Sequence, residues 1–167
     1  MQFNATIDYP ADAARVAQML ADEDFVQRKI AASGALDSSL EVLRDGDAFT
    51  VTTRRQMPTD QVPASFRSLV GQSLDVRLVE AWEAPGPDGS RRGTLSLDIV
   101  GAPVRVTGRM SLEPTGPGSS REVLAGDITA SIPLFGKHIE KAAAGAVDDV
   151  VAIERRIGLA FLAEQDA

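Results

Sequence analysis

The sequence predicts an α+β fold in which one curved antiparallel sheet of about six to seven strands wraps around a long C-terminal helix. Through most of the chain, apolar residues alternate with polar ones at the period of two that is typical of half-buried strands. Near the C-terminus they recur instead every three to four residues, as on one face of a helix. An antiparallel sheet of this size has to bury one face, and this helix is the only expected element long enough to cover it. A sheet curled around one long helix is a helix-grip fold.

The chain is expected to begin with a strand and a pair of short helices. Polar and apolar residues alternate over residues 3–7, and Pro10 ends that strand. Asp12 is a suitable N-cap for a first helix, and a second helix is expected over residues 25–32. The acidic run at residues 22–24 separates the two helices.

Period-two alternation then predicts the other strands in order. They are expected over residues 40–43, 49–56, 74–82, 95–99, 104–112 and 121–132. Short turns connect them, and Asp45-Gly46 is a strong hairpin signal. Residues 57–72 differ because Pro58 and Pro63 are incompatible with a central strand. Pro63 is suited to open a short amphipathic helix that carries Phe66.

The last expected element is one helix from Leu134 to Ala163, roughly 40 Å long at ~1.5 Å per residue. Its expected apolar stripe consists of Phe135, Ile139, Ala142, Ala143, Ala146, Val150, Ile153, Ile157 and Phe161. The small residues around Gly145 give the middle of this helix a thin profile, although glycine costs ~1 kcal/mol relative to alanine there. A thin helix either packs tightly on the sheet or leaves space for a ligand. No repeat or linker interrupts the pattern, so residues 1–167 are expected to form a single domain.

Composition argues against several classes of function. The 167 residues carry a net charge of −7 without a basic cluster, so we expect no nucleic-acid partner and no preference for an anionic membrane surface. The absence of cysteine removes disulfides, thiol nucleophiles and zinc–thiolate sites. The N-terminal residues lack a signal-peptide pattern, and no apolar run approaches the ~20 residues that span a bilayer. We therefore expect a cytoplasmic protein, monomeric or homodimeric, with no cofactor and no stable membrane insertion.

Five stretches of the chain carry a resemblance to a known family. They are IDYPADAARV, RRQMPTDQVPASFRSLVG, VEAW, GAPVRVTGRMSL and IPLFGKHIEK. Together they resemble a bacterial family of unknown function in the START-like superfamily, also called SRPBCC, which includes polyketide cyclases and birch-pollen-allergen-type proteins. The resemblance covers nearly the whole chain. It implies a cavity between the sheet and the last helix, which in the superfamily holds lipids, quinones, sterols or polyketides.

The residues expected to bind a ligand face the interior of the sheet or of the last helix. They are Arg55, Met57, Phe66, Leu78, Glu80, Trp82, Leu97, Met110, Phe135, Ile139, Ala143 and Ala146. Glu80 and Arg55 are in phase with the interior faces of neighbouring strands, so their side chains could meet. Either they anchor the polar headgroup of a ligand, or they form a structural ion pair or reach solvent at the strand ends. Residues 57–70 either cover the cavity mouth as a lid or plug it with hydrophobic side chains.

Two further candidates are interpreted as structural. His138, the single histidine, lies at the flank of the helix stripe in the first turn, where the helix dipole disfavours a protonated imidazole. We therefore favour a flank residue over a general base. Asp148 and Asp149 are neighbours on a helix and point about 100° apart, so they are expected to be solvated rather than to form an acid pair or a metal site.

The leading hypothesis for function is the binding or carriage of a hydrophobic or amphipathic small molecule. The alternative is a cyclase- or dehydratase-like enzyme that uses the same cavity, with Glu80, Arg55 and Tyr9 as the candidate acid–base groups. A third hypothesis is a protein-interaction scaffold that binds no ligand. No residue is assigned a catalytic role from the sequence.

Overall fold

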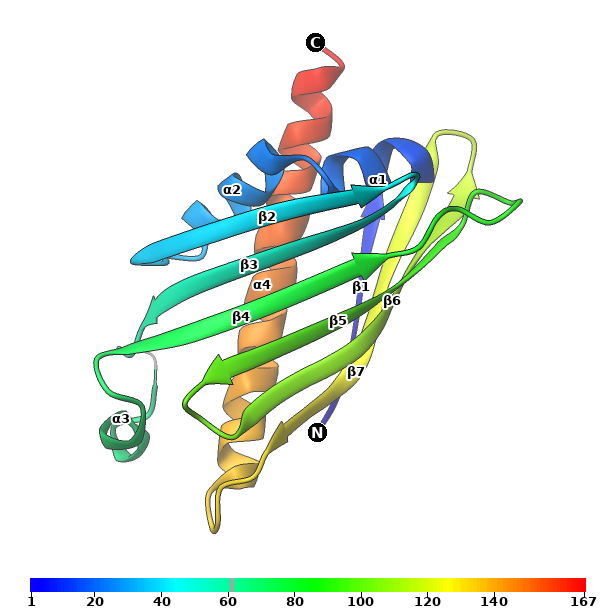
Figure 1. Ribbon diagram of the computed structural model, residues 1–167. Helices are drawn as coiled ribbons and strands as arrows, with labels where there is room; N and C mark the ends of the chain where they lie inside the picture. Colours follow the sequence, from blue (N-terminus) through cyan, green and yellow to red (C-terminus); the bar gives the residue numbers. More distant parts are fainter. Residues whose placement is uncertain (61) are drawn as a thin grey trace.

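The computed structural model describes residues 1–60 and 62–167, except for the side chain of Leu69. Seven strands form one antiparallel sheet in the order β1-β7-β6-β5-β4-β3-β2. The strands are β1 (Gln2–Tyr9), β2 (Asp37–Asp45), β3 (Ala48–Pro58), β4 (Ser73–Trp82), β5 (Arg91–Val100), β6 (Val104–Gly116) and β7 (Ser119–Ala130). The helices are α1 (Ala13–Leu20), α2 (Glu23–Ala32), α3 (Ala64–Val70) and α4 (Gly136–Gln165). Figure 1 shows the curved sheet wrapped around α4, which confirms the predicted helix-grip fold.

Two aspartates set the starts of the first two helices. The Asp12 side chain accepts a hydrogen bond of 2.8 Å from the Arg15 backbone N–H, as predicted for the N-cap of α1. Asp22 does the same for α2, accepting from the N–H groups of Asp24 and Phe25. The acidic run that was expected to separate the helices therefore supplies the cap of the second one.

Two glycines face each other across β6 and β7 in the curved sheet. Gly108 pairs with Gly126, and Phe3 of β1 lies opposite Gly126 on its other side. A Cβ atom on Gly126 would collide with the Thr107 carbonyl oxygen and come within 2.9 Å of the Phe3 ring. Glycine is thus required here by the close approach of three neighbouring strands.

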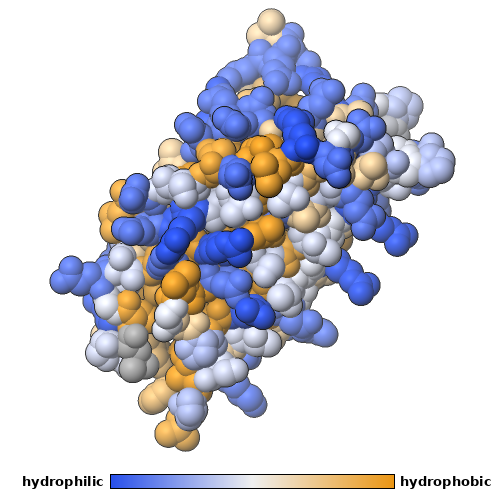
Figure 2. All heavy atoms as spheres, in the orientation of Figure 1, coloured by the Kyte–Doolittle hydropathy of each residue, from blue (hydrophilic) through white to orange (hydrophobic). Residues whose placement is uncertain are grey.

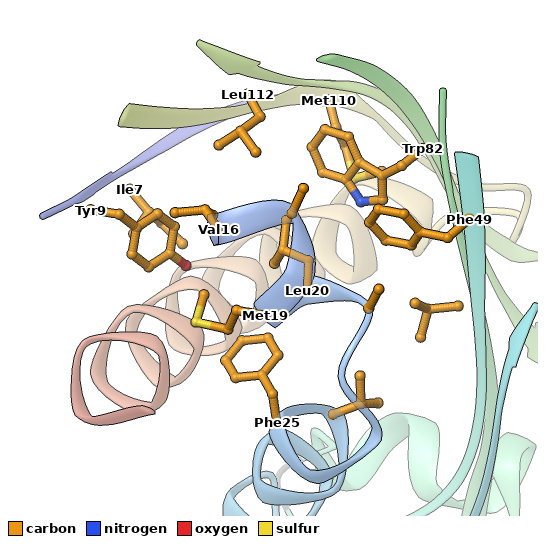
Figure 3. Packing of buried hydrophobic residues seen from close by; sticks show 14 of the residues in the cluster. Ile7, Tyr9, Val16, Met19, Leu20, Phe25, Phe49, Trp82, Met110 and Leu112 are labelled. Carbon is orange, nitrogen blue, oxygen red and sulfur yellow. The ribbon is translucent and has the colours of Figure 1, made fainter. Parts of the chain in front are cut away.

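The hydrophobic core lies at the end of the sheet that α1, α2 and the last turns of α4 cover. Figure 3 shows Phe49 and Trp82 from the sheet facing Leu20 of α1. The Phe49 and Trp82 rings stack with centroids 6.4 Å apart. On the other side of this core, Phe25 of α2 meets Phe161 of α4 edge to face at 5.7 Å. One aromatic pair therefore joins two neighbouring strands, and the other joins two helices.

The long C-terminal helix follows the prediction in extent but differs in rotation. Its 30 residues span about 45 Å, and it packs mainly on β1, β7 and α2. Its half-buried side chains in the N-terminal half include Ile139, Ala143 and Val147, whereas Ala146 and Val150 are exposed. The expected stripe placed Ala142, Ala146 and Val150 inside. It was wrong at these positions because the helix rests on one edge of the sheet and on α2, which turns a neighbouring face inward.

Candidate functional site

The inward side of strands β3, β4 and β5 changes character along its length. Beneath α1 and α2, residues such as Phe49, Val51 and Trp82 are buried. Toward α3 the inward side chains keep partial contact with solvent, although most of them are apolar. We call this set the half-buried inner face; from the sheet it comprises Arg55, Met57, Leu74, Val76, Leu78, Glu80, Leu97 and Ile99, and from α4 it comprises Ile139, Ala143 and Val147. Apolar side chains that point inward yet remain wetted indicate that α3 and α4 cover this end of the sheet incompletely.

A cluster of charged side chains lies at the deep end of the half-buried inner face. Lys29 of α2 donates to Glu154 of α4 across 2.7 Å, and both are buried, at 8% and 5% exposed. Glu122 of β7 and Tyr9 of β1 lie beside this pair and are buried as well. The charge of Glu80, on β4, also contributes to the raised pKa of Lys29, so Glu80 shares the electrostatic environment of the cluster. Five elements therefore bring ionisable groups to one place.

Burial and mutual repulsion decide the charges of this cluster. Burial, followed by repulsion from Glu154, holds the pKa of Glu122 well above its ordinary value. Burial also raises the pKa of Glu80, although the charge of Lys29 opposes that rise. Burial disfavours the Lys29 ammonium, but attraction by Glu154 and Glu80 outweighs burial and raises the pKa of Lys29. Burial and the charge of Glu154 raise the pKa of Tyr9, so its hydroxyl stays protonated.

Three buried oxygens in the cluster indicate where a proton resides. Within the described part of the chain, the Tyr9 hydroxyl, Glu122 Oε2 and Glu154 Oε1 are sealed from solvent without a hydrogen-bond partner of ordinary geometry. The Glu122 and Glu154 carboxyls are close enough for a hydrogen bond between them to raise the pKa of Glu122. A proton on Glu122, donated to Glu154, supplies a partner for both of these carboxylate oxygens.

The predicted meeting of Arg55 and Glu80 is only indirect. Arg55 is paired in register with Val76, whereas Glu80 lies opposite Val51, four residues further along β4. The Arg55 guanidinium makes one long hydrogen bond, 3.5 Å to Thr53 Oγ1. Burial lowers the pKa of Arg55, and the charge of Glu80 offsets part of that effect. The two groups therefore share one electrostatic environment without forming a direct ion pair.

The open end of the half-buried inner face is bordered by an aromatic contact. Phe66 of α3 and Phe135, next to the start of α4, meet edge to face with ring centroids 5.1 Å apart. Phe66 is buried at 7% exposed, whereas Phe135 is 43% exposed. The neighbouring Leu134 is 94% exposed and has a φ of 68°, in the left-handed region. Figure 2 shows hydrophobic atoms at the tip of the molecule where Figure 1 places the β7–α4 connection.

The remaining predicted residues fall outside the half-buried inner face. Trp82 and Met110 belong to the closed core, and Ala146 lies on the exposed side of α4. His138 is exposed in the first turn of α4. Asp148 and Asp149 are exposed as well, as expected for solvated residues.

The sequence reasoning missed Lys29, Glu122 and Glu154. Glu122 could have been found, because it shares the inward phase of Leu124 and Ile128 on its strand. Glu154 could not, since its inward position depends on the rotation of α4.

The outer face of the sheet is hollowed as well. An open hollow of about 760 Å³ lies on the outer face of the sheet, lined by residues of β1, β5, β6 and β7 that include Asn4, Thr107 and Asp127. Over the described residues, no group of three or more His, Asp or Glu side chains is arranged to hold a metal ion. No described helix combines the length and the apolar character that crossing a bilayer requires.

Solved structures identify the class to which this fold belongs. It is similar to a START superfamily protein from Mycobacterium smegmatis, with a TM-score of 0.54, 17% identity and coverage of 92% of this chain and 94% of that one. It is also similar to the Zhui aromatase/cyclase from Streptomyces sp. R1128, with a TM-score of 0.62, 13% identity and coverage of 100% and 96%. The protein therefore has a START-like helix-grip fold.

Sequence comparison then places the chain within one family. The family model described as "Protein of unknown function (DUF2505)" matches residues 4–162, so the chain belongs to this family. A relative from Mycobacterium tuberculosis (strain CDC 1551 / Oshkosh), Uncharacterized protein MT0499, is 26% identical over 161 residues, which cover 92% of each chain. This confirms the resemblance found in the five sequence stretches.

Proposed function

We propose that this protein binds or carries an amphipathic small molecule, of the lipid, quinone or polyketide-like kind, along the half-buried inner face. The observation that supports the proposal most strongly is the row of apolar side chains, such as Leu78 and Leu97, that point inward yet remain half-buried. Covering them would stabilise a complex by about 25 cal/mol for each Å² of apolar surface removed from water. The charged cluster at the deep end would receive the polar part of the ligand.

The proposed binding residues follow from this placement. Leu78, Leu97, Met57, Ile139 and Ala143 would contact the apolar part of the ligand, and Arg55 and Glu80 its polar end. Phe66 and Phe135 would border the entrance as a lid. Trp82 and Met110 would close the far end as part of the packed core.

A matched pair of substitutions on α4 tests the proposal. Ala143→Leu adds volume on the half-buried inner face, whereas Ala146→Leu adds the same volume on the exposed side of the same helix. After exposure to a bacterial lipid extract, native mass spectrometry of the wild-type protein should show a bound species. Ala143→Leu should lose that species while it keeps its circular dichroism spectrum, and Ala146→Leu should retain it. Detection of the bare wild-type mass alone, or equal binding by both variants, would contradict the proposal.

A second candidate function is acid–base catalysis on a bound polyketide-like substrate. The observation in its favour is the raised pKa of Glu80, a half-buried carboxyl group next to Tyr9, Glu122 and Glu154. A general acid works best when its pKa lies near the operating pH. If the protein is such an enzyme, Glu80→Gln should bind a linear polyketide mimic but no longer convert it, as followed by chromatography and mass spectrometry. Absence of any conversion by the wild-type protein would leave binding as the function.

A further inference from the structure

The side chain that stands out on the half-buried inner face is Arg55, because its charge lacks a close partner. A guanidinium offers five N–H donors, and burying it is unfavourable unless those donors are hydrogen-bonded. Arg55 makes one hydrogen bond, at 3.5 Å to the buried Thr53 hydroxyl. Within residues 1–60 and 62–167, no carboxylate oxygen lies within 4.0 Å of the Arg55 nitrogens. The apolar environment of Arg55 accordingly lowers its pKa.

Other cations of the molecule that are buried or close to Arg55 do have partners. Lys29 is paired with Glu154 at 2.7 Å. Arg91 donates to the Asp47 carbonyl oxygen at 2.6 Å and lies over the Phe49 ring. Arg54, the residue before Arg55 on β3, points to the outer face and is bound by Asp75. Arg54 is therefore an outward cation paired with a carboxylate, whereas Arg55 is a half-buried inward cation that contacts no carboxylate of the described residues.

The groups around Arg55 indicate which kind of ligand would pair with its guanidinium. The charged and titratable groups of the interior include Tyr9 on β1, Lys29 on α2, Arg55 on β3, Glu80 on β4, Arg91 on β5, Glu122 on β7 and Glu154 on α4. Among the described residues, Lys29 and Glu154 are in direct contact, whereas Arg55 contacts no carboxylate. The planar fork of a guanidinium matches a carboxylate, which it can bind through two parallel hydrogen bonds.

We propose, building on the ligand-binding function above, that the polar end of the ligand is a carboxylate held by Arg55. The ligand is then an amphipathic carboxylic acid whose chain lies against Met57, Ile99 and the other apolar side chains of the half-buried inner face.

A pair of probes with the same chain tests the carboxylate. Isothermal titration calorimetry would compare dodecanoate with dodecan-1-ol, using the wild-type protein, Arg55→Gln and the matched control Arg54→Gln. Hydrogen bonds to charged groups are worth enough that we expect the wild-type protein and Arg54→Gln to bind dodecanoate about ten-fold more tightly than the alcohol. Arg55→Gln should bind both probes equally, with the affinity that the wild-type protein has for dodecan-1-ol.

The outcomes separate this inference from the proposed function. If neither probe binds to the wild-type protein, the ligand-binding function itself is contradicted. If both probes bind equally, the ligand-binding function stands, and the proposal that Arg55 holds a carboxylate is contradicted. Tighter binding of dodecylammonium than of dodecanoate would also overturn the inference, because it would make Glu80 rather than Arg55 the anchor.

Discussion

Gly126 illustrates how one position can limit the approach of neighbouring strands. It lies between Gly108 and Phe3, and a Cβ atom there would meet the Thr107 carbonyl oxygen. A helical glycine, Gly145, is different, since a Cβ atom on it would meet nothing within 4 Å. The sequence interpretation linked Gly145 to a thin helix over the sheet, but its side of α4 is exposed. Only the strand glycine is explained by close packing.

These two glycines provide a prediction about stability. Gly126→Ala should lower the free energy of unfolding by about 1–3 kcal/mol, because the strands have to move apart to accept the methyl group. Gly145→Ala should raise it by up to about 1 kcal/mol, since alanine is the better helix former and has room. Urea denaturation followed by circular dichroism measures both. A Gly126→Ala variant as stable as the wild-type protein would show that the close approach is not needed.

At the scale of elements, the long helix performs two tasks with its two halves. The C-terminal half is fixed by Lys29–Glu154 and by the contact between Phe25 and Phe161. The N-terminal half contributes small residues, among them Ala143, to the half-buried inner face. One helix thus joins a packed core to an incompletely covered region.

The short helix α3 contacts the start of α4 through an aromatic pair. Phe66 packs on Phe135, while the adjacent Leu134 projects into solvent. Phe66→Ala should therefore speed amide hydrogen exchange in residues 64–70 by about ten-fold, given the loss of an aromatic pair and of buried area. Leu134→Ala removes a side chain of similar size without this contact and should leave the exchange of α3 unchanged. Equal effects of the two variants would show that α3 is held by other contacts.

At the scale of the whole molecule, the buried carboxyl groups make the free energy of unfolding depend on pH. Burial raises the pKa of both Glu122 and Glu80 in the folded protein relative to the unfolded chain. The unfolded chain therefore loses these protons first as the pH rises above about 4.5, and the folded state holds them longer. The stability contributed by these protons is complete at lower pH and is lost as the pH rises through the folded-state pKa values.

This linkage leads to a prediction about the slope of stability between pH 5 and pH 8. The free energy of unfolding of the wild-type protein should contain a component that falls with rising pH, and Glu122→Gln should reduce that fall because glutamine does not titrate. Glu41→Gln, on the exposed side of β2, is the control and should leave the slope unchanged. Urea denaturation at several pH values gives the slopes. A Glu122→Gln slope equal to that of the wild-type protein would contradict the assignment of the proton.

The sequence by itself determined the order of the elements and the inward face of each strand. The reason is local, because a period of two or of 3.6 is a property of neighbouring residues, as the placement of Leu78 and Leu97 illustrates. The same periodicity found Arg55 and Glu80, whose inward phase the structure bears out.

Tertiary structure decided which side of α4 faces inward and which charges meet beneath it. Lys29 and Glu154 are 125 residues apart in the chain, and no periodicity relates them. Their contact depends on the helix resting on β1, β7 and α2, which turns Glu154 toward Lys29 and leaves Ala146 outside. Rotation of a helix about its axis follows from the packing of its neighbours rather than from its own pattern. For this reason the Lys29–Glu154 pair at the deep end of the half-buried inner face emerged only from the folded molecule.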